Sequence, residues 1–340
     1  MENLKYFTGS FIVTIVGLIL ALVVGGPSAL FIVAVLAVLE VSLSFDNAVV
    51  NATVLKDMDA VWRRRFLTWG ILIAVFGMRI VFPVLIVSIL AGVSPWGAMD
   101  IAINSPEQYA AVMTEAHVSV MAFGGAFLMM VGFSFFFDDD KDHWIPMIEK
   151  PLAQLEKMKF AAELLTLVLI AAVALFMLPE ADKKTFALSG IAGVTTFWVM
   201  HQLTAFMERR EQARVATHAA KSGAAMFIYL ELLDASFSLD GVIGAFAITT
   251  NLFIIAIGLG IGAMFVRSLT ILLVEKDTLS EYVYLEHGAF YAIVALAIMM
   301  FLKTFLHIPE VVTGFIGAGL IGVAFIHSQM LKSKESKSSV

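Results

Sequence analysis

Two stretches of the chain carry the same polar pattern inside apolar sequence. Residues 40–47 and 234–241 each read acid, any residue, Ser, any residue, Ser, any residue and Asp, followed by Asn or Gly. A charged side chain in the bilayer core costs about 2.5–3.5 kcal/mol on insertion scales. Carboxylates that recur in one register therefore need a reason beyond packing, and the chemistry they indicate is cation binding.

The carboxylates and the amide of the two motifs are the predicted metal ligands. We expect a site made by Glu40, Asp46, Asn47, Asp234 and Asp240. The side chains expected beside it are Ser44, Ser238, Glu231, Arg79 and Arg267. Oxygen ligands suit hard ions such as Mn²⁺, Ca²⁺ or Mg²⁺, with Mn²⁺ and Ca²⁺ preferred here. Because the chain has no cysteine, thiolate metal sites and disulfides are excluded.

The charges of these residues do not cancel. Five acids oppose two arginines, which leaves an excess of three negative charges if all are ionised. A low-dielectric core cannot hold such an excess, so cations, protons or both in alternation must neutralise it. Alternation is what a proton-coupled cation exchanger needs, since ligands release protons when metal binds.

A purely structural reading applies to some of the same residues. Small Ser and Gly residues let helices pack closely, and Arg79 and Arg267 fit the role of counter-ions that orient the carboxylates. Glu231 has no acidic counterpart, because Ala37 holds the equivalent place in the first repeat, so both readings stay open for it.

The elements that must position these residues are membrane helices. The chain of 340 residues is 60% hydrophobic and 15% charged, and its mean hydropathy is +0.91. A helix needs about 20 apolar residues to cross the bilayer core. Ten apolar stretches come close to or exceed that length, at 8–24, 28–54, 66–91, 117–137, 160–178, 186–206, 223–249, 252–274, 287–306 and 311–328. The fold class predicted is an all-α, polytopic membrane helix bundle.

The basic residues set the predicted orientation. They cluster in alternate loops, around 56–65, 141–159 and 209–221, and again in the tail after 331, whereas 92–116 has no Lys or Arg. The positive-inside rule assigns the basic loops to the cytoplasm. We therefore expect a multi-pass protein of the cell (plasma or inner) membrane with both termini cytoplasmic.

The two motif helices, 28–54 and 223–249, lie five crossings apart and so run in opposite directions, which is an inverted repeat. Each is followed by a helix that carries glycines and one arginine. Such repeats place a shared site near the membrane midplane, often on interrupted helices.

Ser, Asn and Gly compete with or weaken helical hydrogen bonding, so breaks are expected at 44–47 and 238–241. If the helices stay regular, one stripe holds Glu40, Ser44, Asn47 and Asn51, and the other holds Glu231, Asp234 and Ser238.

The chain is expected to divide into linear segments. A first half covers 1–137, a cytoplasmic linker with two connecting helices covers 138–222, a second half covers 223–330, and a disordered tail covers 331–340. A Lys- and Ser-rich composition of this kind is typical of disorder.

The first motif, Glu40 to Asn47, together with Trp69-Gly70-Ile71 and Arg79, resembles the signature of the TerC family, integral membrane proteins of the LysE transporter superfamily. The resemblance covers about 38–91 and 228–275. It implies paired inverted three-helix units, the same five metal ligands, and a role in metal homeostasis, particularly manganese efflux or metal delivery to exported proteins. The family name derives from tellurite resistance. This chain departs from the pattern by its extra helices and by Gly241, which stands where the first motif has Asn47.

These observations predict a transporter that exports divalent cations of the Mn²⁺ type through a midplane carboxylate site, with proton coupling. Two alternatives stay open, a non-transporting membrane scaffold in metal or tellurite resistance and an exporter of small organic solutes. No nucleophile–base pair or HExxH motif indicates an enzyme, and no phosphate-binding loop or nucleotide motif is present. The expected partners are the lipid bilayer and metal ions, with no nucleic acid, and the sequence names no protein partner.

Overall fold

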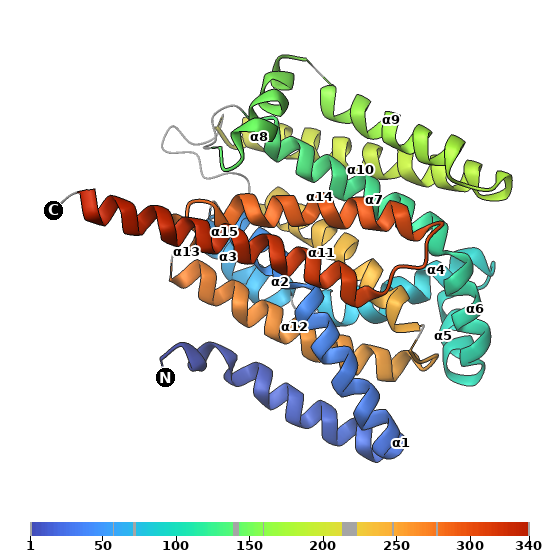
Figure 1. The fold of residues 1–340 in the computed structure, drawn as a ribbon. Helices are drawn as coiled ribbons and strands as arrows, with labels where there is room; N and C mark the ends of the chain where they lie inside the picture. Colours follow the sequence, from blue (N-terminus) through green and yellow to red (C-terminus); the bar gives the residue numbers. More distant parts are fainter. Residues whose placement is uncertain are drawn as a thin grey trace. The chain divides into compact units, whose positions relative to one another are not determined.

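The structure, a computed structural model, describes residues 2–56, 58–70, 73–138, 143–158, 160–212, 223–246, 248–276 and 278–338. Every element of secondary structure in these ranges is a helix, which confirms the all-α class for them (Figure 1). Contacts group the chain into two compact units, one of residues 1–117 and 204–276 and the other of residues 118–203 and 277–340. The linear divisions expected from the sequence stay predictions.

The first unit contains both polar motifs. Its elements, with π-helices at η2 and η3, are η1 Glu2–Phe7, α1 Thr8–Leu43, α2 Phe45–Lys56, α3 Ala60–Arg65, η2 Phe66–Gly70, η3 Ile73–Val81, α4 Phe82–Leu90, α5 Pro95–Asn104, α6 Pro106–Glu115, α11 Gly223–Phe246 and α12 Leu252–Glu275. Side-chain caps start three of them. Asp59 Oδ1 accepts from Val61 N and Trp62 N at α3, Ser94 Oγ accepts from Gly97 N at α5, and Asn251 Oδ1 accepts from Phe253 N and Ile254 N at α12.

Helix α1 is two limbs joined at Gly26. This residue has φ 69° and ψ −166°, a conformation that is essentially restricted to glycine. Figure 1 shows the two limbs meeting at a sharp corner, with Pro27 opening the second limb. Both limbs pack on α12 through a small cluster that includes Ala21, Val33 and Ile261. The predicted boundary between the stretches 8–24 and 28–54 therefore corresponds to the turn at Gly26 inside α1.

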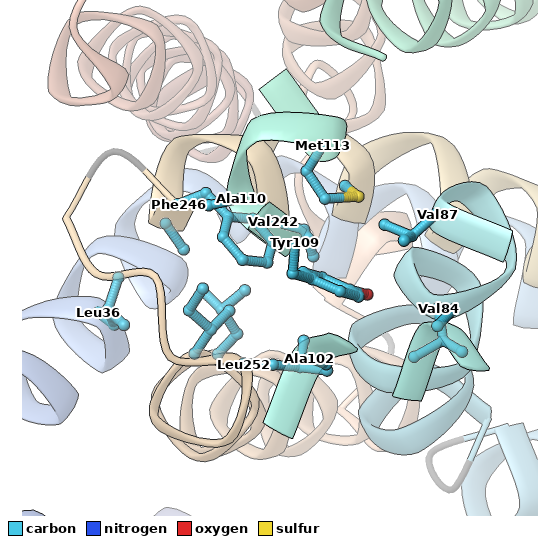
Figure 2. Close-up of a cluster of buried hydrophobic side chains, with 14 residues drawn as sticks. Leu36, Val84, Val87, Ala102, Tyr109, Ala110, Met113, Val242, Phe246 and Leu252 are labelled. Carbon is cyan, nitrogen blue, oxygen red and sulfur yellow. The ribbon is translucent and has the colours of Figure 1, made fainter. Parts of the chain in front are cut away.

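The apolar core of the first unit surrounds Tyr109, whose side chain is fully buried. Figure 2 shows its ring among side chains from α1, α4, α5, α6, α11 and the start of α12. Phe246 contacts the Tyr109 ring with a centroid distance of 5.7 Å. This core fixes the end of α11 that follows the second motif.

The second unit is formed by α7 His117–Phe136, α8 Pro146–Ala153, η4 Gln154–Lys157, α9 Ala161–Phe176, most of α10 Glu180–Gln212, α13 Thr278–Glu281, α14 Leu285–Lys303 and α15 Glu310–Ser338. Helices α14 and α15 run side by side (Figure 1). The buried Glu149 ties α8 to α14, because its Oε1 accepts from the Tyr291 hydroxyl at 3.0 Å while its Oε2 accepts from Trp144 N at 2.7 Å. Trp144 Nε1 in turn donates to His327 Nδ1 of α15 at 2.9 Å.

Length and composition support membrane crossing for part of this bundle. Five helices of the described residues qualify, namely Leu4–Ser42, His117–Phe136, Leu252–Glu275, Leu285–Lys303 and Val312–Ser333. A sixth span results if Phe76–Leu90 and Pro95–Asn104, which meet at 104°, count as one. Helix α11 has 24 residues, enough to cross, but it carries three acidic residues. The described residues thus show five or six candidate spans.

The end of the chain is more regular than the sequence suggests. Helix α15 runs to Ser338, into the stretch 331–340 that was expected to be disordered. Residues 339–340 lie outside the described part. A run of Lys and Ser residues is compatible with a helix that extends beyond an apolar span, since Lys is a good helix former.

Candidate functional site

A cavity of about 50 Å³ lies in the first unit between the two motif segments. Polar side chains from α1, α2, η3, α11 and α12 line it, namely Glu40, Ser44, Asn47, Asn51, Arg79, Asp234, Ser238, Arg267 and Thr270. The structure therefore brings together three of the five predicted ligands, Glu40, Asn47 and Asp234, with four of their predicted neighbours. Asp46 does not line this cavity, and the Asp240 side chain is outside the described part of the structure.

The first motif is interrupted as predicted. Helix α1 ends at Leu43, Ser44 takes φ −105° and ψ 19°, and α2 begins at Phe45. Asp46 Oδ1 accepts from Asn47 N at 2.9 Å and so satisfies one of the free N–H groups that open α2. Glu40, Ser44, Asn47 and Asn51 line the same cavity from both sides of this break.

The second motif is not interrupted. Helix α11 continues from Gly223 to Phe246, so the prediction of a break at 238–241 is wrong. Gly241 stands where the first motif has Asn47, whose backbone N–H donates to Asp46 Oδ1. A Cβ at position 241 would also lie 3.0 Å from Glu40 Oε2, so the glycine leaves room for that carboxylate.

Glu40 is neutralised within the protein. Its Oε1 forms an ion pair with Arg79 Nη2, and Ser44 Oγ donates to the same oxygen at 3.2 Å. Both charged side chains are buried. Arg79 lies on the π-helix η3. π-Helices are rare in proteins, and those that occur are frequently found at functional sites. The structure thus supports the predicted counter-ion role for Arg79.

The stem of Glu40 packs against the glycine face of α12. A Cβ at Gly262 would lie 2.4 Å from Cβ and Cγ of Glu40, and one at Gly258 would lie 2.6 Å from Leu36 Cβ. The spacing Gly-xxx-Gly allows such a close approach of two helices in membranes. A larger side chain at Gly262 would therefore displace Glu40, and one at Gly258 would displace Leu36.

Arg267 has a different partner from Arg79. Its Nε and Nη2 donate to the carbonyl oxygen of Leu67, at 3.0 and 2.7 Å. Leu67 lies in the π-helix η2, where the altered backbone pattern presents a carbonyl to the cavity side. Arg267 therefore supports the backbone of η2, and it forms no ion pair with a carboxylate of the described residues.

Asp234 is held by amides of the first motif segment. Asn51 Nδ2 donates to Asp234 Oδ1 at 2.8 Å, and the Asn47 side chain also approaches this carboxylate. Asn51 is 4% exposed and Asp234 is 8% exposed. Asn51 was expected on the stripe of Glu40, Ser44 and Asn47 but was not predicted as a site residue. Its position four residues after Asn47 was the signal that could have identified it.

Glu231 lies on α11 one turn before Asp234 and interacts with it electrostatically. Its carboxylate occupies the space left by Gly70 of η2, where a Cβ would be 2.8 Å from Glu231 Oε1. Gly70 itself lines the cavity. Neither oxygen of Glu231 has a hydrogen-bond partner among the described residues.

The described residues contain no group of three His, Cys, Asp or Glu side chains arranged to hold a metal ion. The oxygens around the cavity come instead from two kinds of group, carboxylates and neutral amides or hydroxyls. A site of this composition differs from the closed, multi-carboxylate cage of a resident structural ion.

A family model described as "Protein of unknown function (DUF475)" matches residues 45–335. The chain belongs to the DUF475 family. No curated protein and no solved structure matches it. The matched region of this DUF475 protein includes α2, α11 and α12, and therefore all the cavity residues except Glu40 and Ser44.

Proposed function

We propose that this DUF475 protein is a membrane transporter that exports divalent metal cations of the Mn²⁺ type. The observation that carries the proposal is the buried cavity in which Glu40, Asp234, Asn47 and Asn51 converge from two distant parts of the chain. Carboxylate and amide oxygens are the ligands preferred by hard divalent ions. The metal is the cargo in this proposal, and the protein has no enzymatic role.

The size of the cavity favours an ion over an organic solute. Pockets for small molecules measure about 300–1,000 Å³, whereas this cavity measures about 50 Å³. A space of that size suits an ion with a few water molecules, since one water needs about 10–15 Å³ of such volume. An amino-acid exporter would need a wider site in the same conformation.

The architecture proposed around this site is the predicted one. We propose ten crossings, an inverted repeat of the segments 28–54 and 223–249, and cytoplasmic termini in the cell membrane. The five or six candidate spans of the described residues support the multi-pass membrane character, and the basic loops support the orientation. The resemblance to the TerC family supports metal export on the same grounds. Alternating access around the cavity would expose it to each side in turn, with protons replacing the metal on the return.

Uptake of Mn²⁺ into sealed liposomes tests the proposal. Purified protein is reconstituted with a fluorescent metal reporter inside and an imposed pH gradient. We expect flux in the wild type and flux at the level of protein-free liposomes for Asp234→Asn. Asp234→Asn removes the charge but keeps an oxygen that can accept from Asn51, so the fold is retained.

Glu163→Gln is the matched control, because it makes the same kind of change in α9 of the other unit and should leave the flux unchanged. A variant that transports like the wild type would remove its residue from the site. Absence of Mn²⁺ and Ca²⁺ flux in well-folded protein would contradict transport of these ions. The membrane scaffold and the organic-solute exporter would then be the remaining functions.

A further inference from the structure

Glu231 is a buried acidic residue of the first unit that has no neutralising partner among the described residues. Its side chain is buried, with 9% of the residue exposed, and both carboxylate oxygens lack a hydrogen-bond partner among the described residues. Glu40, by contrast, has Arg79 and Ser44 as partners. A buried carboxylate without a donor is costly unless a cation or a proton neutralises it.

Further free oxygens line the cavity, which Glu231 does not itself line but whose wall it reaches at Gly70. Asn47 Oδ1, Asn51 Oδ1 and Ser238 Oγ are buried and have no hydrogen-bond partner within the described part of the chain. All three residues line the cavity together with Asp234 and Gly70. Because Asn51 uses its Nδ2 to donate to Asp234, its carbonyl oxygen is left available for a ligand. Native proteins seldom leave several buried acceptors unsatisfied at one place.

The free atoms identify the class of ligand. Of the five, two are carboxylate oxygens and two are amide carbonyl oxygens, which accept but cannot donate, and the fifth is the Ser238 hydroxyl, which can do either. A ligand that satisfies them must therefore be a cation or a hydrogen-bond donor. Two carboxylates, Glu231 and Asp234, supply two negative charges one helical turn apart, which matches a divalent cation.

We propose that Glu231 is a metal ligand and binds the transported divalent cation with Asp234, Asn51 and Asn47, while Glu40 stays paired with Arg79. The inference rests on the proposed function, whose cargo it uses, and it changes the ligand set expected from the repeated motif. Glu231 lies outside that motif and has no acidic counterpart in the first half. Neutral amides beside only two carboxylates give a site from which an ion can also leave, as transport requires.

Gly70 allows a test that moves the Glu231 carboxylate without removing it. The Cβ of Gly70→Ala would meet Glu231 Oε1 at 2.8 Å, the movable end of a flexible side chain, and Phe66 Cδ2 at 2.9 Å. The helix can therefore form while the carboxylate is displaced. Gly77→Ala is the matched control in the neighbouring π-helix, since its nearest contact is Ile73 Cγ2 at 3.3 Å.

The measurement is Mn²⁺ binding to the purified full-length protein, from the loss of the free Mn²⁺ signal in electron paramagnetic resonance. Glu231→Gln, which keeps the shape and mimics a protonated acid, should weaken binding about tenfold or more. Gly70→Ala should weaken it in the same direction, and Gly77→Ala and Glu163→Gln should bind like the wild type. Thermal unfolding of each variant shows whether the fold is retained.

The outcomes separate this inference from the proposed function. Wild-type affinity in Glu231→Gln, with Mn²⁺ flux preserved, would overturn the ligand role and leave metal transport standing. Binding that depends on Glu231 without flux in liposomes would support the ligand role and contradict transport. Absence of Mn²⁺ binding to well-folded wild-type protein would overturn both.

Discussion

At the scale of single residues, the ion pair with Arg79 distinguishes Glu40, whose charge is neutralised within the protein, from Glu231, whose carboxylate has no partner among the described residues. Glu40 was predicted as a metal ligand because it opens the first motif, and the sequence also predicted Arg79 as a counter-ion. In the structure these two residues form one ion pair, so the negative charge of Glu40 is already neutralised and is not available to a metal ion. Side-chain pairing between residues 39 positions apart depends on how helices pack, so the motif alone could not indicate which acid is neutralised.

The pair can be tested by removing one partner or both. Arg79→Met leaves the buried Glu40 carboxylate without its cation and should cost about 3–5 kcal/mol. The double variant Glu40→Gln/Arg79→Met removes both charges and should recover much of that loss. The unfolding temperature, followed by tryptophan fluorescence, measures the difference. Equal destabilisation of the single and double variants would mean that the pair does not neutralise Glu40. Because Glu40 is not a metal ligand in our proposal, we also expect the double variant to bind Mn²⁺.

At the scale of elements, the two predicted helix interruptions have different outcomes. Asp46 provides a side-chain acceptor at the start of α2, and the break at Ser44 is present. The second motif has Ser and Asp at the same places, Ser238 and Asp240, with Gly241 in place of Asn47, and α11 stays continuous. The polar pattern that the two motifs share therefore does not by itself determine where a helix breaks.

Other elements could not be predicted from periodicity. The π-helices η2 and η3 over Phe66–Gly70 and Ile73–Val81 have ordinary apolar sequences. Their backbone pattern places Gly70 against Glu231 and Leu67 O against Arg267. These contacts span well over a hundred residues of sequence, and tertiary packing decides them.

Gly26 is a position at the element scale where the backbone conformation requires glycine. The turn inside α1 needs φ 69° and ψ −166°, which other residues adopt at a cost of about 1–3 kcal/mol. Gly26→Ala should therefore lower the unfolding temperature, although no neighbouring atom lies within 4 Å of the added Cβ. Gly9→Ala is the control, because it also meets no atom within 4 Å but lies in regular helix, where Ala is preferred over Gly. Equal unfolding temperatures for Gly26→Ala and wild type would contradict the strained turn.

At the scale of the whole molecule, composition was sufficient for the class but not for the number of crossings. Mean hydropathy predicted a membrane helix bundle, and the described residues are helical with five or six candidate spans. Crossings by the motif segments are harder to predict, because their acidic residues lower the mean hydropathy of helices that are long enough to cross. Both motifs nevertheless lie in one unit, with residues 1–117 joined to 204–276, as a shared site requires.

The bent pair Phe76–Leu90 and Pro95–Asn104 decides between two topologies of the first unit. Ten crossings place residues 92–116 outside the cell, whereas a re-entrant pair bent by 104° would return to the side from which it entered. The absence of cysteine makes the wild type a background without labelling, so single cysteines report directly on accessibility. Trp96 is 84% exposed, and Ser333 lies near the end of the chain. With a membrane-impermeant maleimide added to intact cells, Trp96→Cys should label at once and Ser333→Cys only after permeabilisation. Labelling of Trp96→Cys only after permeabilisation would mean that this pair does not reach the outside, and the count of ten crossings would be wrong.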